Sequence, residues 1–228
     1  MNGQHAVTGL LKKLQADVAG FFSTPRPASG MSLFEIACWG NAEKTLQGEL
    51  LCHLRSKDWF AVQEAGFLCA SDIPRKFTER DIDILVFTRS PGASTMPTPL
   101  CCIELKHFSS NQGSAKALCK GLDADMMRRH PHTGHAFVPL MQVAMYTTIA
   151  TFDEKADKVG LHRFARSYCG PVKRRDFLNQ FDSWRNGKAW IIDPVIHQDT
   201  DPYAACRLLS GETMTGKVDA FVGVRAPQ

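Results

Sequence analysis

Two apolar segments that carry acidic residues constrain the fold of this chain more than any other feature. Residues 81–88 and 100–107 are short, rich in Ile, Leu, Val and Phe, and separated by a loop of Ser, Pro, Gly and Thr. This is the pattern of two β-strands. Because alternate residues of a strand share a face, Glu104 and Lys106 point the same way, with apolar residues opposite. If the two strands pair as a hairpin, Asp83 lies on that face with them.

A sheet face with two carboxylates and a lysine has a chemical use. Mg²⁺ prefers oxygen ligands and keeps several waters, so one or two carboxylates on a rigid strand suffice to hold it beside a phosphate. The metal polarises the phosphoryl group and supplies a hydroxide-like nucleophile. A lysine at that place orients or deprotonates the attacking water. The alternative is a solvated sheet face with cross-strand ion pairs, and the two strands by themselves leave both interpretations open.

A third carboxylate lies on an expected helix over residues 41–56. Glu43 falls on the same helical stripe as Leu46, Leu50 and Leu54. A carboxylate that faces a core needs a partner, a metal or an exposed edge. The alternative is a carboxylate of the first turn that complements the helix dipole.

A second helix is expected to open at Pro139 and to run through Ile149. Within it Gln142 and Tyr146 are four residues apart, which makes them neighbours on one helix face. Both are polar-tipped residues in an apolar segment, so each needs a hydrogen-bonding partner. The alternative is a satisfied core tyrosine beside a glutamine.

Together these residues resemble the PD-(D/E)XK nuclease superfamily and, within it, the RecB-type branch. The pattern of that branch is a helix glutamate, a strand aspartate, an E-x-K on the next strand and Q-x-x-x-Y on a following helix. Those positions read Glu43, Asp83, Glu104 to Lys106, and Gln142 to Tyr146, in this order. The resemblance covers about residues 33–150. E-x-K alone arises often by chance, whereas the ordered set is more specific.

The resemblance implies an α/β fold with a restriction-endonuclease-like core, in which helices flank a mixed central β-sheet. It implies a metal-dependent deoxyribonuclease that hydrolyses DNA phosphodiester bonds with metal-activated water. Asp83 and Glu104 would bind Mg²⁺, which Mn²⁺ would replace. Glu43 would be a further ligand, direct or through water, and Lys106 would position or activate the water. A catalytically inactive relative that binds nucleic acid or a protein partner is the alternative function.

The resemblance also gives roles to further positions and leaves some positions open. Gln142 and Tyr146 would contact the nucleic-acid backbone or brace the site. Asp81 shares a strand face with Asp83, and we prefer Asp83 because it leads directly into the apolar run. The upstream histidine of many RecB-type nucleases has no clear counterpart, since His53 lies on the right helix but is as readily explained as a solvated residue.

A basic segment follows the site residues. From residue 158 to residue 175 there are six Lys or Arg and no acidic residue. Such side chains suit phosphate oxygens, so we expect this segment to contact DNA, with a solvated basic loop as the alternative. Its cations are Lys158, Arg163, Arg166, Lys173, Arg174 and Arg175.

Composition places limits on the class of protein. The chain has 228 residues, 27 Lys and Arg against 23 Asp and Glu, and no apolar run long enough to cross a membrane. The eight cysteines form no CxxC pair and sit among apolar residues, as in a reducing compartment, so a cytoplasmic location is expected. We expect residues 1–30 to form a helical arm and linker and residues 31–228 a single domain. A homodimer or a larger repair, restriction or phage complex is compatible with these features.

Further elements follow from periodicity and turn signals. We expect helices over residues 5–22, 114–129 and 175–186. We expect additional strands at residues 59–63, 159–166, 189–192 and 218–224.

Overall fold

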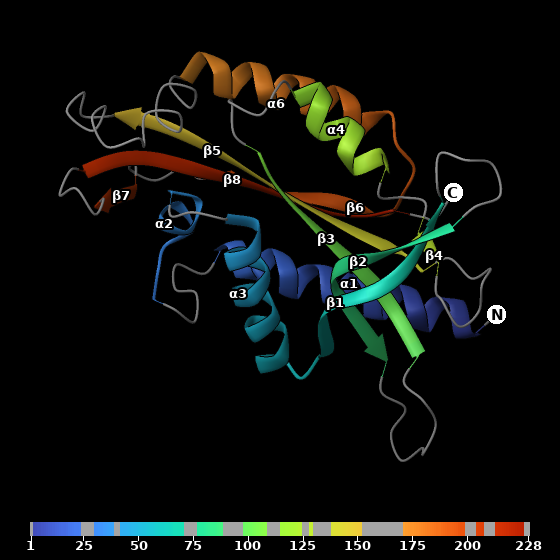
Figure 1. Cartoon of the computed structure of the whole chain (residues 1–228). Coiled ribbons are helices and arrows are strands. Elements are labelled where there is room, and N and C mark those ends of the chain that lie inside the picture. Colours follow the sequence, from blue (N-terminus) through green and yellow to red (C-terminus); the bar gives the residue numbers. More distant parts are fainter. Residues whose placement is uncertain are drawn as a thin grey trace.

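In the computed structural model the chain forms three layers, with a sheet between two groups of helices (Figure 1). The residues that it describes are 2–23, 30–38, 42–70, 77–88, 98–108, 115–124, 128–129, 138–151, 171–198, 204–207 and 213–225. One face of the sheet is covered by α1 (Asn2–Ser23), α2 (Leu33–Cys38) and α3 (Ala42–Ser56). The other face is covered by α4 (Ala115–Ala124) and α6 (Pro171–Asn186). The α/β class expected from the sequence is confirmed.

The described strands form one mixed, eight-stranded sheet. They are β1 (Phe60–Ala70), β2 (Phe77–Thr88), β3 (Thr98–Phe108), β4 (Arg128–Arg129), β5 (Leu140–Thr151), β6 (Trp190–His197), β7 (Ala204–Arg207) and β8 (Thr213–Arg225). The strand order is β4-β1-β2-β3-β5-β8-β6, and β7 pairs with β8 off this path. β3 and β5 are parallel and the other pairs are antiparallel. A parallel pair needs a crossover, and α4 lies in the connection between β3 and β5.

The larger core lies between the sheet and α1, α2 and α3. The helix at the N-terminus, expected as part of an arm, buries Leu11, Leu14 and Val18 in this core. Its Gln15 Nε2 donates hydrogen bonds to the carbonyl of Asp193 at 2.8 Å and to that of Val222 at 3.0 Å. α1 is therefore fixed to the sheet by both apolar contacts and side-chain hydrogen bonds. None of the helices in the described ranges is both long and apolar enough to span a bilayer.

The second core lies under α4 and α6 and is largely aromatic. Phe177 and Phe181 of α6 pack on the sheet, where Tyr146 and Phe221 face them. The rings of Tyr146 and Phe177 are stacked with centroids 4.0 Å apart. Leu122 adds the contact from α4. Two separate cores thus cover the two faces of β5.

The prediction of a helix that begins at Pro139 is wrong, because this segment forms the strand β5. β5 lies in the interior of the sheet between β3 and β8, and every residue from 141 to 148 is buried. A strand that is buried on both faces shows no alternation, so its apolar run is hard to tell from a buried helix. The helix expected over residues 114–129 also ends earlier, at Ala124, and residues 128–129 form β4. The strand expected at residues 159–166 lies outside the described residues.

The remaining expected elements are present. The helices over residues 5–22, 41–56 and 175–186 correspond to α1, α3 and α6. The strands at residues 59–63, 81–88, 100–107, 189–192 and 218–224 correspond to β1, β2, β3, β6 and β8, most of which extend further than expected. Two short elements, α2 and β7, were not expected.

Candidate active site

The hairpin of β2 and β3 opens at the position of the expected site. The backbone pairing of β2 with β3 begins at the pair Thr88 and Thr98 and ends at the pair Ile84 and Ile103. On β3 the amide of Cys102 donates to the carbonyl of Pro139 beside β5, so the amides of odd-numbered residues point toward β2. Beyond Ile103 these amides require partners other than the backbone of β2.

Two of the expected acidic residues supply those partners. The Leu105 amide donates to Asp83 Oδ2 at 2.8 Å, and the His107 amide donates to Glu43 Oε1 at 2.8 Å. Successive odd-numbered amides of a strand are about 6.6 Å apart, so the two carboxylates come to the same stretch of β3 from different elements. Asp83 comes from β2 and Glu43 from the first turn of α3. The side chain of Asp81 is exposed, which supports Asp83 as the principal strand carboxylate.

Glu104 and Lys106 lie on the same part of β3. Glu104 is 3% exposed, and its Oε2 lies 3.8 Å from Lys106 Nζ. Leu85 pairs with Cys102, and Ile84 pairs with Ile103. If this register is continued by one residue, Asp83 stands opposite Glu104. Glu43, Asp83, Glu104 and Lys106 therefore all lie along one stretch of β3, where Asp83 and Glu43 contact its amides and Glu104 and Lys106 are its own side chains.

A fourth acidic residue stands in the same register. On β1 Gln63 pairs with Ile84 and Ala65 pairs with Ile82, so Glu64 stands opposite Asp83. Glu64, Asp83 and Glu104, on three neighbouring strands, are called the carboxylate row below. Glu64 has φ of 51°, a left-handed conformation that is uncommon for this residue type.

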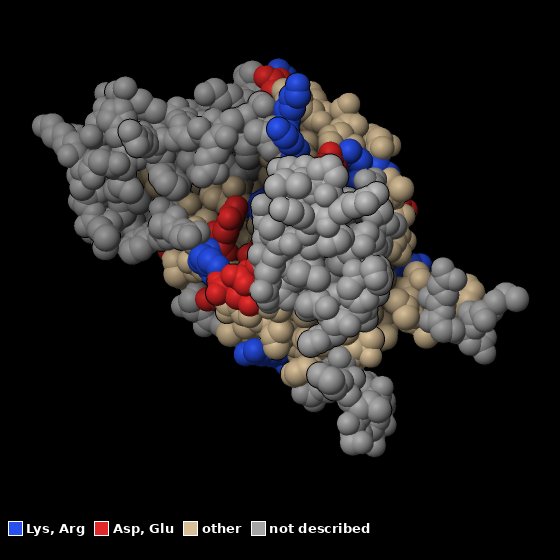
Figure 2. Space-filling model, turned by 45° about the vertical axis from the view of Figure 1, so that its right-hand side comes forward, with Lys and Arg blue, Asp and Glu red and all other residues tan. Residues whose placement is uncertain are grey.

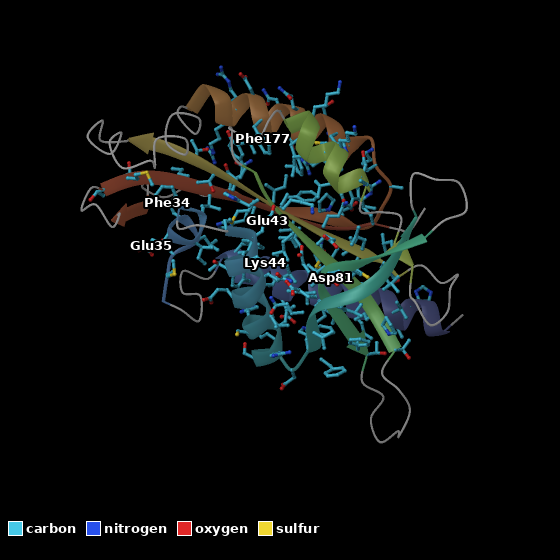
Figure 3. All side chains as sticks on the ribbon, in the orientation of Figure 1. Phe34, Glu35, Glu43, Lys44, Asp81 and Phe177 are labelled. Carbon is cyan, nitrogen blue, oxygen red and sulfur yellow. The ribbon has the colours of Figure 1, made fainter. Side chains whose placement is uncertain are left out.

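A lysine of α3 lies against this row. Lys44 Nζ forms an ion pair with Glu64 Oε1. The hydrogen bond to Glu64 raises the pKa of Lys44 above its usual value, against the opposing effect of desolvation, and the charges of Asp83 and Asp81 raise it further. Figure 3 labels Glu43 and Lys44 on α3 and Asp81 on β2. On the face seen in Figure 2, acidic and basic side chains gather side by side. Sequence reasoning missed Lys44 and Glu64.

Gln47 fixes the backbone of β2 at the site. It lies one turn of α3 beyond Glu43, is fully buried, and its Nε2 donates to the carbonyl of Asp83 at 2.5 Å. Glu43 and Gln47 thus link the same helix to β3 and β2 at the point where those strands separate. α3 holds the opening between the strands in a fixed shape.

His107 is a further residue that sequence reasoning missed. Its Nε2 lies 3.0 Å from Thr147 Oγ1 of β5, while its amide binds Glu43. Burial lowers the pKa of His107 to about 4. The imidazole is therefore neutral at pH 7.

The lowered pKa of His107 gives a prediction for the stability of the metal-free protein. Between pH 6.5 and 4 the unfolded chain binds a proton that the folded chain does not, so the free energy of unfolding falls as the pH is lowered through this range. We expect a contribution of about 3 kcal/mol, complete above pH 6.5 and lost by pH 4. Urea unfolding in EDTA at several pH values measures it. The substitution His107→Gln should remove this part of the slope, and parallel profiles for the two proteins would contradict the prediction.

Gln142 and Tyr146 are placed differently from the expectation. On a strand, residues four apart share a face but lie about 13 Å from each other, so they are not neighbours. Gln142 stands beside Glu104 in the register of β3 and β5, is fully buried, and its Nε2 donates to the carbonyl of Leu122 in α4. Tyr146 is 4% exposed and stacks on Phe177. Gln142 therefore links β5 to α4 beside Glu104, whereas Tyr146 belongs to the aromatic core.

The basic segment lies mostly outside the described residues, which exclude Lys158, Arg163 and Arg166. Lys173 is placed in α6 by its backbone. Arg174 forms a two-point ion pair with the buried Asp219, with N–O distances of 2.6 and 2.5 Å. Arg175 is exposed. Contact of this segment with DNA stays a prediction.

The residues of the opening suit a hard divalent cation. Glu104 and Asp83 offer carboxylate oxygens, which Mg²⁺ prefers, and one or two protein carboxylates with several waters make up its usual coordination. Within the described part of the chain, no three His, Cys, Asp or Glu side chains are gathered closely enough to hold a metal together. The carboxylates of Asp83 and Glu43 are each turned toward an amide of β3. Asp83 and Glu104 therefore fit a site in which two carboxylates bind the cation and water molecules complete its coordination.

Comparison of the chain with family models, curated proteins and solved structures finds no match.

Proposed function

We propose that this protein is a metal-dependent deoxyribonuclease of the PD-(D/E)XK type, RecB-type branch, with a restriction-endonuclease-like core. The observation that carries the proposal is the opening of the β2–β3 ladder, at which Asp83 binds the Leu105 amide next to the buried Glu104 and to Lys106. Acidic residues and a lysine at the split of two paired strands provide what phosphodiester hydrolysis needs.

The order of elements along the chain supports the same proposal. A helix with Glu43 is followed by β1, by β2 with Asp83 and by β3 with Glu104 and Lys106. α4 and the parallel strand β5 come next. The helix that would carry Q-x-x-x-Y is the departure, because Gln142 is on β5. The support therefore comes from the acidic residues and the lysine, without the Q-x-x-x-Y motif.

Each residue of the site has a role in this proposal. Asp83 and Glu104 would hold Mg²⁺ or Mn²⁺, with Glu43 as a further ligand, direct or through water. When bound, the metal would polarise the phosphoryl group and lower the pKa of a bound water. Lys106 would orient the attacking water and offset negative charge on the phosphate. Gln47 and the Leu105 amide hold the main chain and carboxylate of Asp83 in place.

The proposal is tested by incubating the purified chain with supercoiled plasmid and with linear DNA over a titration of Mg²⁺ or Mn²⁺. We expect no cutting in EDTA and cutting that rises with either metal. Gel mobility shift in EDTA measures DNA binding separately. Binding without cutting at every metal concentration would favour the inactive relative, and neither binding nor cutting would contradict the whole proposal.

A matched pair of substitutions tests which strand aspartate serves the site. Asp83→Asn keeps the size of a side chain that receives the Leu105 amide and removes its charge. We expect it to lower the cutting rate about 100-fold, as loss of a metal ligand does. Asp81→Asn alters an exposed residue two positions away and should keep the rate within a few-fold. The initial rate of plasmid nicking compares them, and equal losses would contradict the assignment.

A further inference from the structure

We propose that Lys44 supplies a positive charge to the carboxylate row, so that it limits cation binding there and helps to receive a DNA phosphate. This inference rests on the proposed function, because it gives Lys44 a role at the same site. Lys44 would act through its charge, both on Glu64 and Asp83 and on the incoming phosphate. No sequence motif pointed to it.

The first support is the place of Lys44 in the fold. It follows Glu43 in the first turn of α3, and Glu43 binds the amide of His107 on β3. That bond ties the start of α3 to the opening between β2 and β3. Lys44 is thereby held at the side of β1 and β2, where its ammonium reaches Glu64.

The second support is the conformation of its partner. Glu64 stands opposite Asp83 and has a positive φ. A left-handed conformation is unfavourable for a non-glycine residue and persists where surrounding contacts require it. Here it coincides with the ion pair to Lys44 and with the point at which β2 leaves β3.

The third support is the balance of charge. The ammonium of Lys44 pairs with Glu64, and the negative charges of Asp83 and Asp81 also act on it. Without it the site would repel a phosphodiester more strongly and attract cations more strongly. The ammonium of Lys44 reduces both effects without occupying the position of Glu104 and Lys106.

The test measures Mn²⁺ affinity by isothermal titration calorimetry without DNA. Lys44→Met removes the charge while keeping an unbranched side chain, and we expect it to bind Mn²⁺ about fivefold more tightly. Lys44→Arg keeps the charge and should match the unchanged protein. Lys57→Met is the control, because this exposed lysine lies 13 residues further along, about 20 Å away at the helical rise.

A kinetic measurement separates this role from a merely structural ion pair. With saturating Mg²⁺, Lys44→Met should raise the KM for DNA about fivefold and leave kcat within about twofold, because an ammonium beside a bound phosphate acts on binding. Glu64→Gln should instead weaken Mn²⁺ binding, since it removes a negative charge from the row.

The outcomes distinguish a failure of the Lys44 role from a failure of the proposed nuclease function. Unchanged Mn²⁺ affinity and unchanged KM in Lys44→Met would overturn the role of Lys44 and leave the metal site intact. Absence of Mn²⁺ binding by the unchanged protein would overturn the proposed function and this inference with it. Tighter binding in Lys44→Met, with Lys44→Arg and Lys57→Met unchanged, supports the inference.

Discussion

Replacing Lys106 with alanine is expected to lower metal-dependent DNA cutting about 1,000-fold. Loss of a residue that acts on the attacking water, or of one that stabilises developing charge, has effects of about this size, and Lys106 would serve in both ways. Lys106 is the cation adjoining the buried Glu104, with its Nζ 3.8 Å from Glu104 Oε2. Its side chain is 30% exposed, so it is open to solvent on one side. Initial rates of plasmid nicking at saturating Mg²⁺ measure the loss.

Two further variants make this result specific. Lys116→Ala alters an exposed lysine of α4 and should leave the rate unchanged. Lys106→Arg keeps the charge but replaces a compact ammonium with a planar guanidinium, which does not position water in the same way, so it should recover only part of the rate. Thermal unfolding of each variant separates lost chemistry from lost folding. Equal residual cutting by the unchanged protein and Lys106→Ala would point to a contaminant and contradict the assignment.

The strands and the acidic residues of the site could be predicted from the sequence because their signals are local. Two-residue alternation in segments 81–88 and 100–107 identifies the strands and their faces without knowledge of the rest of the chain. The stripe through Glu43 likewise depends only on the period of one helix. The expectation that a core-facing Glu43 needs a partner agrees with its hydrogen bond to the His107 amide. The sequence pattern could not predict which group that partner is.

The parts of the site that were missed depend on register between distant segments. Glu64 stands opposite Asp83 only because β1 and β2 pair in one particular register, and Lys44 reaches Glu64 only because α3 is fixed beside them. The sequence around Glu64 carries no turn or glycine signal for its positive φ. Gln142 was assigned to a helix because a doubly buried strand lacks alternation. Its position beside Glu104 follows from the β3–β5 pairing, which is again non-local.

A charged junction between α4 and β8 is expected to carry much of the stability of the second layer. Asp123 accepts hydrogen bonds from Arg225 Nη1 at 2.7 Å, from Lys188 Nζ at 2.9 Å and from Trp184 Nε1 at 3.2 Å. The side chain of Arg225 is 3% exposed, and its guanidinium lies 5.8 and 5.7 Å from the ring centroids of Trp184 and Trp190. The hydrogen bonds from Lys188, Arg225 and Trp184 outweigh the opposing effect of burial, so the pKa of Asp123 lies below its usual value.

We expect Asp123→Ala to lower the free energy of unfolding by about 2 to 4 kcal/mol, because it leaves the buried Arg225 charge without its carboxylate partner. For a chain of this size the melting temperature should fall by roughly 5 to 12 °C. Asp182→Ala is the matched control, since it breaks an ion pair with Arg185 on the surface of α6 at 2.7 Å, and exposed pairs contribute about 1 kcal/mol or less. Urea unfolding at pH 7 measures both. A loss in Asp123→Ala no larger than that in Asp182→Ala would mean that the aromatic rings, rather than the carboxylate, hold Arg225 in place.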